Sequence, residues 1–459
     1  MFKPAVRARP NPREHVDIRC SALAVIETFW VYISGNEESL YSDVLLTAQM
    51  KGRTMQKTPK ALRLHIALFG RTNVGKSTFL NIIAGQDVAI TSPIPGTTTD
   101  VVEKSMELLP IGPVLFLDTG GLDDDSVLGI ERVNRAKKTM DRADIVLLIC
   151  ESGYFGEYEE KILASAKHKK LPLITIINKT DLVPVTKEFR KKLLAQSAGV
   201  IECNAEDKTH RERIVDDLKD QLKMVLSDEF KKPLHLVGDL VPPKGIIVLI
   251  IPIDIEAPKG RLILPQVQTM RSALDHDAMV VVVKENEYAY MLTQLKNPPD
   301  LVVCDSQVVD KMVANTPDGV PCTTFSILFA RLKSDMMTFI QGASAIDKLR
   351  TGDRILVSES CSHHAMEDDI GRIKIPRWLR KYTNAKLEFD SCAGRDFPDD
   401  LSKYSLIIQC GGCMNNRAEM LSRLQRAENA RVPITNYGLC IAQIHGVMDR
   451  VIEPLIGRM

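Results

Sequence analysis

The sequence has no long apolar run and no dense group of cysteines, and its charges nearly cancel. No apolar run approaches the ~20 residues that cross a bilayer as a helix, so no membrane span is expected. Ten cysteines are scattered over 459 residues, which argues against a secreted disulfide scaffold and favours reduced thiols. A formal net charge of +1 argues against a general binder of nucleic acid or membrane surfaces. We therefore expect neither nucleic acid nor membrane as a partner.

The length and composition indicate an ordinary globular protein of about three domains. Residues 1–60 are expected to be an N-terminal extension of uncertain structure. The start, "MFKPAVRARPNPR", has four basic residues and no acidic one, as in some organelle transit segments, but it lacks their serine content. The domains that follow are expected at residues 61–232, 233–322 and 323–459.

A buried strand, a glycine-rich loop and a helix are predicted from Leu64 onward. The loop "GRTNVGKS" matches G-x-x-x-x-G-K-[ST] in the strand–loop–helix context that this motif requires. Its backbone N–H groups can cradle phosphates, Lys76 can reach the β- and γ-phosphates, and Ser77 can coordinate Mg²⁺. The expected nucleotide-binding residues of the loop are Gly70, Asn73, Val74, Gly75, Lys76, Ser77 and Thr78.

Two further apolar strands lead into nucleotide-binding motifs. "VLFLDTGG" ends in Asp118-x-x-Gly121, where the carboxylate can hold Mg²⁺ through water and the glycine N–H can approach the γ-phosphate. "LITIINKTD" ends in Asn178, Lys179 and Asp181. The Asp181 carboxylate can accept hydrogen bonds from the guanine N1–H and exocyclic amine, groups that adenine does not supply. The expected nucleotide is therefore GTP or GDP, and "ECNAED" stands where the last guanine-contacting loop is expected.

The segment "PIPGTTTD" supplies the threonines of a switch loop, and we expect Thr99 to bind Mg²⁺ together with Ser77. The expected catalytic residues are Lys76, Thr99, Asp118 and Gly121. These motifs resemble those of the translation-factor-like GTPases, and among them the Era and tRNA-modification group. The resemblance implies a K⁺ ion at Asn73. Slow hydrolysis is expected because Leu122 stands where Ras-type enzymes carry a glutamine that orients water.

Residues 233–322 follow a linker rich in proline and glycine and carry no catalytic motif. Strongly β-branched segments alternate there with one helical stretch. This pattern predicts a small α/β module with an exposed strand edge, and such edges often pair across a dimer axis.

Two cysteine groups follow apolar strands in the last part of the chain. "DRILVSESCSHHA" leads into Cys361 and His363, and "SLIIQCGGC" leads into Cys410 and Cys413. Ligands gather at the carboxyl ends of parallel strands, so the two groups can meet in space. Three sites fit these residues: a redox dithiol, a zinc site on all four, or a [4Fe–4S] cluster on the three cysteines. The residues alone do not separate zinc from a cluster, while a dithiol leaves Cys361 unexplained.

From Leu62 onward the chain resembles the HydF-type GTPases that mature [FeFe]-hydrogenase. The resemblance rests on strings such as "PGTTTD", "ESCSHH", "DDIGRIKIPRWLRK", "CGGCMNNRAEMLSR" and "VPITNYG". It implies a [4Fe–4S] cluster held by Cys361, Cys410 and Cys413, with His363 as a further ligand. Gln409 stands where the family has a histidine, which leaves the fourth iron ligand open.

The resemblance implies an α/β protein with a P-loop GTPase domain, a dimerisation domain and a Rossmann-like cluster domain, in a homodimer or higher oligomer. It implies a slow GTPase, using Mg²⁺ and K⁺, that is a scaffold or carrier for the di-iron precursor. The implied partners are apo-[FeFe]-hydrogenase and two radical-SAM maturases. The implied location is the cytoplasm, or an organelle of an anaerobic eukaryote or alga if residues 1–60 are a transit peptide. The alternative is a tRNA-modification or ribosome-associated GTPase with a structural zinc, and a third class is a GTP-regulated thiol reductase.

Overall fold

The computed structural model describes residues 58–85, 102–119, 136–226, 235–253, 262–360, 369–394 and 396–456. These residues form three sheets with their helices, and each is considered by itself. Within these ranges, no helix is long and apolar enough to cross a membrane.

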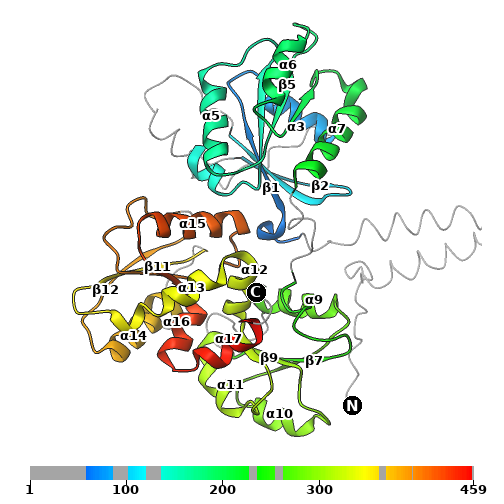
Figure 1. The fold of residues 1–459 in the computed structure, drawn as a ribbon. Helices are drawn as coiled ribbons and strands as arrows, with labels where there is room; N and C mark the ends of the chain where they lie inside the picture. The colour runs from blue at the N-terminus through cyan, green and yellow to red at the C-terminus, as the bar shows by residue number, and fades with distance from the viewer. Residues whose placement is uncertain are drawn as a thin grey trace, which may run out of the picture. The chain divides into compact units, whose positions relative to one another are not determined.

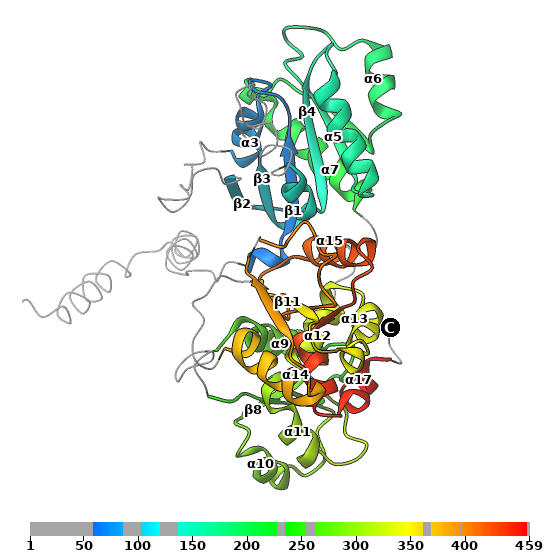
Figure 2. The ribbon, with the colours of Figure 1, turned by 90° about the vertical axis from the view of Figure 1, so that its left-hand side faces the viewer.

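The first sheet has six strands in the order β2-β3-β1-β4-β5-β6. Neighbouring strands are parallel except β2 and β3, which are antiparallel. Figure 2 shows β1, β3 and β4 side by side. The central strands are almost purely apolar because helices cover both of their faces. The strand bounds are Leu64–Phe69 (β1), Val102–Leu108 (β2), Gly112–Asp118 (β3), Ile145–Glu151 (β4), Leu173–Asn178 (β5) and Gly199–Glu202 (β6).

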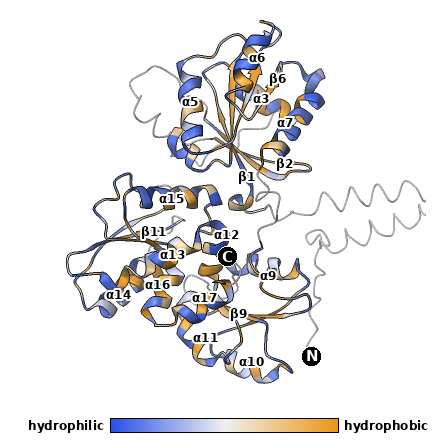
Figure 3. Ribbon diagram, in the orientation of Figure 1, coloured by the Kyte–Doolittle hydropathy of each residue, from blue (hydrophilic) through white to orange (hydrophobic). Residues whose placement is uncertain are grey.

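Helices pack on both faces of this sheet (Figure 1). Helices α3 (Lys76–Ala84) and α7 (Arg211–Val225) share one core with β1, β3 and β4. Helix α5 (Glu157–His168) packs on the opposite face, and α6 (Lys187–Leu194) packs against β4 and β5. Figure 3 shows the result as hydrophobic strands flanked by helices with one polar side.

The second sheet has four parallel strands in the order β10-β9-β7-β8. Strand β8 lies at an edge, and two of its side chains, Met279 and Val282, are about half exposed. The strand bounds are Ile246–Ile250 (β7), Met279–Val283 (β8), Leu301–Cys304 (β9) and Cys322–Thr324 (β10). The helix bounds are Leu264–Leu274 (α9), Tyr288–Gln294 (α10), Val309–Asn315 (α11) and Phe325–Lys333 (α12).

The third sheet has four parallel strands in the order β12-β11-β13-β14. The chain winds outward in both directions from the β11–β13 pair, so a topological switch point lies between these two strands. The strand bounds are Arg354–Ser358 (β11), Glu388–Cys392 (β12), Leu406–Gln409 (β13) and Ile434–Asn436 (β14). The helix bounds are Met336–Ala343 (α13), Ile375–Thr383 (α14), Arg417–Asn429 (α15), Tyr437–Ile444 (α16) and Met448–Ile456 (α17).

The three sheets of mostly parallel strands with their helices confirm the α/β fold class expected from the sequence. Buried side chains from the second and third sheets and their helices form one continuous hydrophobic core, from Leu236 to Leu455. Residues 1–57 of the expected N-terminal extension lie outside the described residues.

Candidate functional site

The glycine-rich loop between β1 and α3 requires two of its glycines. Gly75 has a φ of 94°, and a Cβ there would lie 2.3 Å from Asn178 Nδ2. A Cβ on Gly70 would lie 2.6 Å from the carbonyl oxygen of Ile149. The buried Lys76 folds back over the loop, and its Nζ lies 2.6 Å from Gly70 O and 2.8 Å from Arg71 O. The loop therefore has the tight, glycine-dependent strand–loop–helix form of a phosphate-binding loop, with the Lys76 ammonium held over it.

Asn178, at the end of β5, joins three parts of this site. Its Nδ2 donates to Val74 O at 2.8 Å in the glycine-rich loop, and its Oδ1 accepts from Ala205 N at 3.0 Å. Ala205 lies in the "ECNAED" segment, so that weak sequence match is placed beside the Asn178 motif. Lys179 has a φ of 58°, and its Nζ lies 2.5 Å from Glu151 Oε1. Asp181 is exposed at the surface.

Asp118 ends β3 at the same edge of the sheet and is buried. It is the register partner of Leu68, two residues before Gly70. Thr119 Oγ1 donates to Leu68 O at 2.7 Å, which ties the end of β3 to the end of β1. The structure thus brings Asp118, the glycine-rich loop and Asn178 to one edge, as the sequence predicts. Thr99 and Gly121 lie outside the described residues.

Arg71 anchors the glycine-rich loop. The motif G-x-x-x-x-G-K-[ST] does not predict this role, because any residue is allowed at its second position. Its Nε donates to Oε1 of the fully buried Glu159 at 2.8 Å, and its guanidinium lies 3.9 Å from the centre of the Tyr154 ring. Glu159 belongs to α5, so this pair fixes the start of the phosphate loop to a helix of the opposite face.

The C-x-x-C segment lies in the loop between β13 and α15, at the switch point of the third sheet. Cys410 N donates to Ser358 O at 2.8 Å, and the Ser360 backbone N–H donates to Cys410 Sγ at 3.1 Å. Ser360 directly precedes Cys361 in the sequence, so the segment that leads to Cys361 contacts Cys410. Cys361 and His363 themselves lie outside the described residues.

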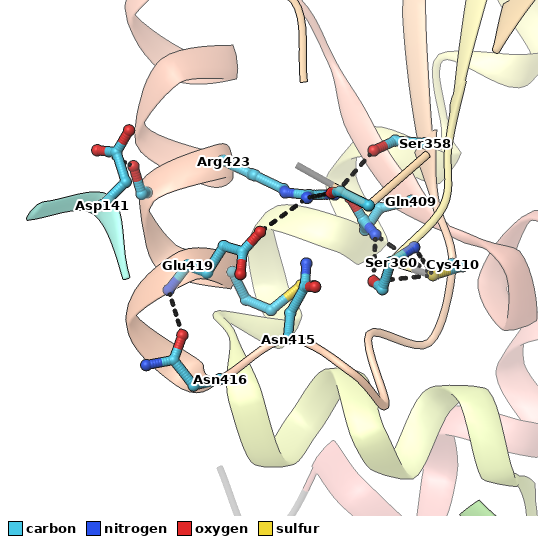
Figure 4. A network of polar contacts seen from close by, with 12 residues as sticks. Asp141, Ser358, Ser360, Gln409, Cys410, Asn415, Asn416, Glu419 and Arg423 are labelled. Atoms are coloured by element: carbon cyan, nitrogen blue, oxygen red, sulfur yellow. Dashed lines mark hydrogen bonds and ion pairs between the residues drawn. The ribbon is translucent and has the colours of Figure 1, made fainter. Parts of the chain in front are cut away.

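Gln409 is fully buried and its amide is hydrogen-bonded on both sides (Figure 4). Its Oε1 accepts from Arg423 Nη1 at 3.0 Å, and its Nε2 lies 3.5 Å from Cys410 Sγ and 3.3 Å from Ser360 Oγ. Arg423 also donates to Glu419 Oε1 at 2.9 Å. The amide therefore presents its NH₂ group, rather than its oxygen, to the cysteine.

The described part of this site fits a metal centre held by thiolates. Burial raises the pKa of the Cys413 thiol to about 11, and a bound metal cation would lower it. The N–H groups of Ser360 and Gln409 that face Cys410 Sγ are donors of the kind that a ligating thiolate accepts. Within the described ranges, which exclude Cys361 and His363, no three His, Cys, Asp or Glu side chains are grouped to hold a metal ion. The full ligand set thus stays a prediction.

Sequence models of known families match three successive parts of the chain. Residues 65–179 match the 50S ribosome-binding GTPase family. Residues 236–334 match the Hydrogen maturase F dimerization domain, and residues 337–454 match the Hydrogen maturase F tetramerization domain. The chain belongs to the HydF-type hydrogenase maturase GTPases. This confirms the resemblance and the P-loop GTPase domain, and the two oligomerisation domains of the HydF type support a homo-oligomer.

Curated relatives match a smaller part of this HydF-type chain. The tRNA modification GTPase MnmE of Synechococcus sp. (strain JA-3-3Ab) is 47% identical over 126 residues, which is 27% of this chain and 26% of the relative. GTPase Der of Wolinella succinogenes is 30% identical over 200 residues, 41% of each chain. The matched part of the chain thus covers between about a quarter and two-fifths of the length of these relatives. Among solved structures, Era of Aquifex aeolicus bound to GDP·AlF₄⁻ matches with a TM-score of 0.29 and 22% identity, covering 50% of this chain and 98% of Era.

Proposed function

We propose that the chain is a GTP-hydrolysing scaffold or carrier for the di-iron precursor in [FeFe]-hydrogenase maturation. The observation that carries this proposal is the combination, in one chain, of a phosphate loop with two HydF-specific domains and a C-x-x-C loop at a sheet switch point. In open parallel sheets the switch point is the usual place for a ligand. Apo-hydrogenase and two radical-SAM maturases are the proposed partners, in the cytoplasm or an organelle.

The third domain is proposed to hold a [4Fe–4S] cluster through Cys361, Cys410 and Cys413, with His363 near the remaining iron. When bound, such a cluster supplies an iron with an exchangeable coordination position. The protein's own part is to present the thiolates and to donate hydrogen bonds to them. Ser360 N and Gln409 Nε2 are so placed toward Cys410. Because the Gln409 oxygen already accepts from Arg423, Gln409 is not proposed as an iron ligand.

The GTPase domain is proposed to be a switch rather than a fast enzyme. Ser77 and Thr99 would hold Mg²⁺, Lys76 would face the phosphates, and Asp181 would select guanine. Asn73, exposed in the loop with a φ of 64°, is the proposed K⁺ ligand. Strand β8, which ends the second sheet among the described residues, is the proposed pairing surface of a homodimer, because its backbone and half-exposed apolar side chains are suited to strand addition.

Anaerobic reconstitution of the full chain tests the cluster. We expect about four irons and matching sulfide per protomer, and an EPR signal after reduction. Cys410→Ala should lose the iron, whereas Cys392→Ala in β12 should keep it and serve as the matched control. GTP hydrolysis should survive in both variants because the nucleotide site has its own core. Full iron content in Cys410→Ala would contradict the cluster assignment.

The second candidate is a tRNA-modification or ribosome-associated GTPase with a structural zinc. The 47% identity to a tRNA modification GTPase and the match to a 50S ribosome-binding GTPase family favour it. Stoichiometric zinc in the same purified protein, with no iron retained, would support this candidate instead.

A further inference from the structure

Lys333, the last residue of α12, lies directly beneath the C-x-x-C loop. Its residue surface is 2% exposed. Its Nζ donates to three backbone carbonyls of this loop: Gly412 O at 2.8 Å, Cys413 O at 3.2 Å and Asn415 O at 2.8 Å. An ammonium carries three protons, so one short loop accepts all of its hydrogen bonds. The loop is thereby held from a helix that is about eighty residues away in the sequence.

Burying the charged side chain of Lys333 costs desolvation free energy. A buried ammonium loses its hydration, and this loss has to be offset by hydrogen bonds or by a nearby anion. Its three hydrogen-bond acceptors are neutral carbonyls rather than carboxylates. The loop that carries these carbonyls also carries the thiols of Cys410 and Cys413, and a thiol that binds a metal becomes a thiolate. The carboxylate of Glu419 is itself hydrogen-bonded to Arg423. A thiolate on this loop would add an attraction for the ammonium that the neutral carbonyls do not supply.

We infer that Lys333 is a positioning residue and a built-in counter-charge for a thiolate-bound cluster on the Cys410–Cys413 loop. This inference rests on the proposed function. Three thiolates and a [4Fe–4S]²⁺ core sum to one net negative charge, and reduction adds another. A fixed ammonium against the loop stabilises the reduced form more than the oxidised form, because the attraction grows with the negative charge. It also fixes three carbonyls of the loop to the end of α12, which positions the backbone that carries the two cysteines.

The test compares three substitutions at Lys333 in the full chain with Lys381→Met. Lys381 is an exposed lysine in the last turn of α14, which makes it a matched control. Lys333→Met removes both charge and donors, Lys333→Gln keeps a donor without the charge, and Lys333→Arg keeps the charge. Each protein is reconstituted anaerobically with iron and sulfide. The readouts are iron retained under a chelator and the midpoint potential from an EPR-monitored titration. Thermal unfolding and GTP hydrolysis check folding.

We expect Lys333→Met and Lys333→Gln to lose iron about 10-fold faster or more, and their clusters to have a more negative midpoint potential than wild type. Lys333→Arg should restore the potential in part, and Lys381→Met should match wild type. If Lys333→Met does not fold, Lys333→Gln decides the question. If the clusters of Lys333→Met and Lys333→Gln had the wild-type midpoint potential, Lys333 would not be a counter-charge, even if these variants retained less iron. An unchanged midpoint potential would contradict only the inference about Lys333. A wild-type protein that binds no cluster would contradict both this inference and the proposed function.

Discussion

The hydrogen-bond network around Arg423 should stabilise the cysteine domain even without metal. Arg423 is 3% exposed and donates to Gln409 Oε1, Ser358 Oγ, Glu419 Oε1 and Gly394 O. Arg423→Met keeps much of the apolar stem but leaves the fully buried Gln409 oxygen without its donor and Glu419 without its cation. An unsatisfied buried polar group costs ~1–3 kcal/mol, and a broken buried ion pair costs ~3–5 kcal/mol. Glu419 is 15% exposed and can recover some hydration. We therefore expect Arg423→Met to lower the free energy of unfolding by about 3 kcal/mol.

Arg426→Met on the same helix is the matched control for Arg423→Met. Arg426 is 21% exposed, and its carboxylate partner Asp399 is 71% exposed, so the loss should be ~1 kcal/mol or less. Urea unfolding of the apoprotein is followed by fluorescence of Trp378, which lies in α14 of this domain, with Trp30 replaced by Phe. A difference between the two variants of under ~1 kcal/mol would refute the reasoning that Arg423 completes a buried network.

Three further predictions concern the first domain. Asp181→Asn should weaken GTP binding by orders of magnitude in a fluorescent-nucleotide titration, since the acceptor for the guanine N1–H and amine is lost; unchanged affinity would remove Asp181 from the guanine site. Hydrolysis should be faster in K⁺ than in Na⁺, with the difference abolished in Asn73→Ala; equal rates in both salts for the wild type would exclude the potassium site. Burial lowers the pKa of His65 to about 4, so its contribution to stability is complete above the unfolded pKa of about 6.5 and is lost as the pH falls toward 4. His65→Gln should therefore flatten this acid dependence by up to about 3 kcal/mol in unfolding measured across that range, and identical pH profiles would contradict the assignment.

The features of the fold and site that can be predicted from the sequence depend on local patterns. The phosphate loop needs glycines at fixed spacing after a strand. A Cβ at Gly70 or Gly75 would clash with neighbouring backbone or side-chain atoms, as the motif implies. The expectation that Cys410 lies near the segment leading to Cys361 required only parallel strands, and β11 and β13 are indeed adjacent. The placement of Cys361 and His363 at the site stays a prediction, as do the expected domain boundaries.

Other features depend on contacts that no local pattern encodes. Lys333 is one lysine among many in the sequence, and its role is visible only because α12 ends beneath a loop of a different sheet. Gln409 stood out as a departure from the family pattern, but its orientation is set by Arg423, fourteen residues later on α15. Likewise, the Arg71–Glu159 pair joins a variable motif position to a helix on the far face. In each case a tertiary contact, rather than residue spacing, decides what the side chain does.

Activation of apo-[FeFe]-hydrogenase is the decisive measurement of the proposed carrier role. The full chain is reconstituted anaerobically, incubated with the two radical-SAM maturases and their substrates, re-isolated, and mixed with apo-[FeFe]-hydrogenase. We expect hydrogen evolution with the wild-type chain and none with Cys410→Ala, while Cys392→Ala behaves as wild type. Equal hydrogen evolution from Cys410→Ala, or none from a wild-type chain that carries its cluster, would contradict the proposal that this protein carries the di-iron precursor on its cysteine domain.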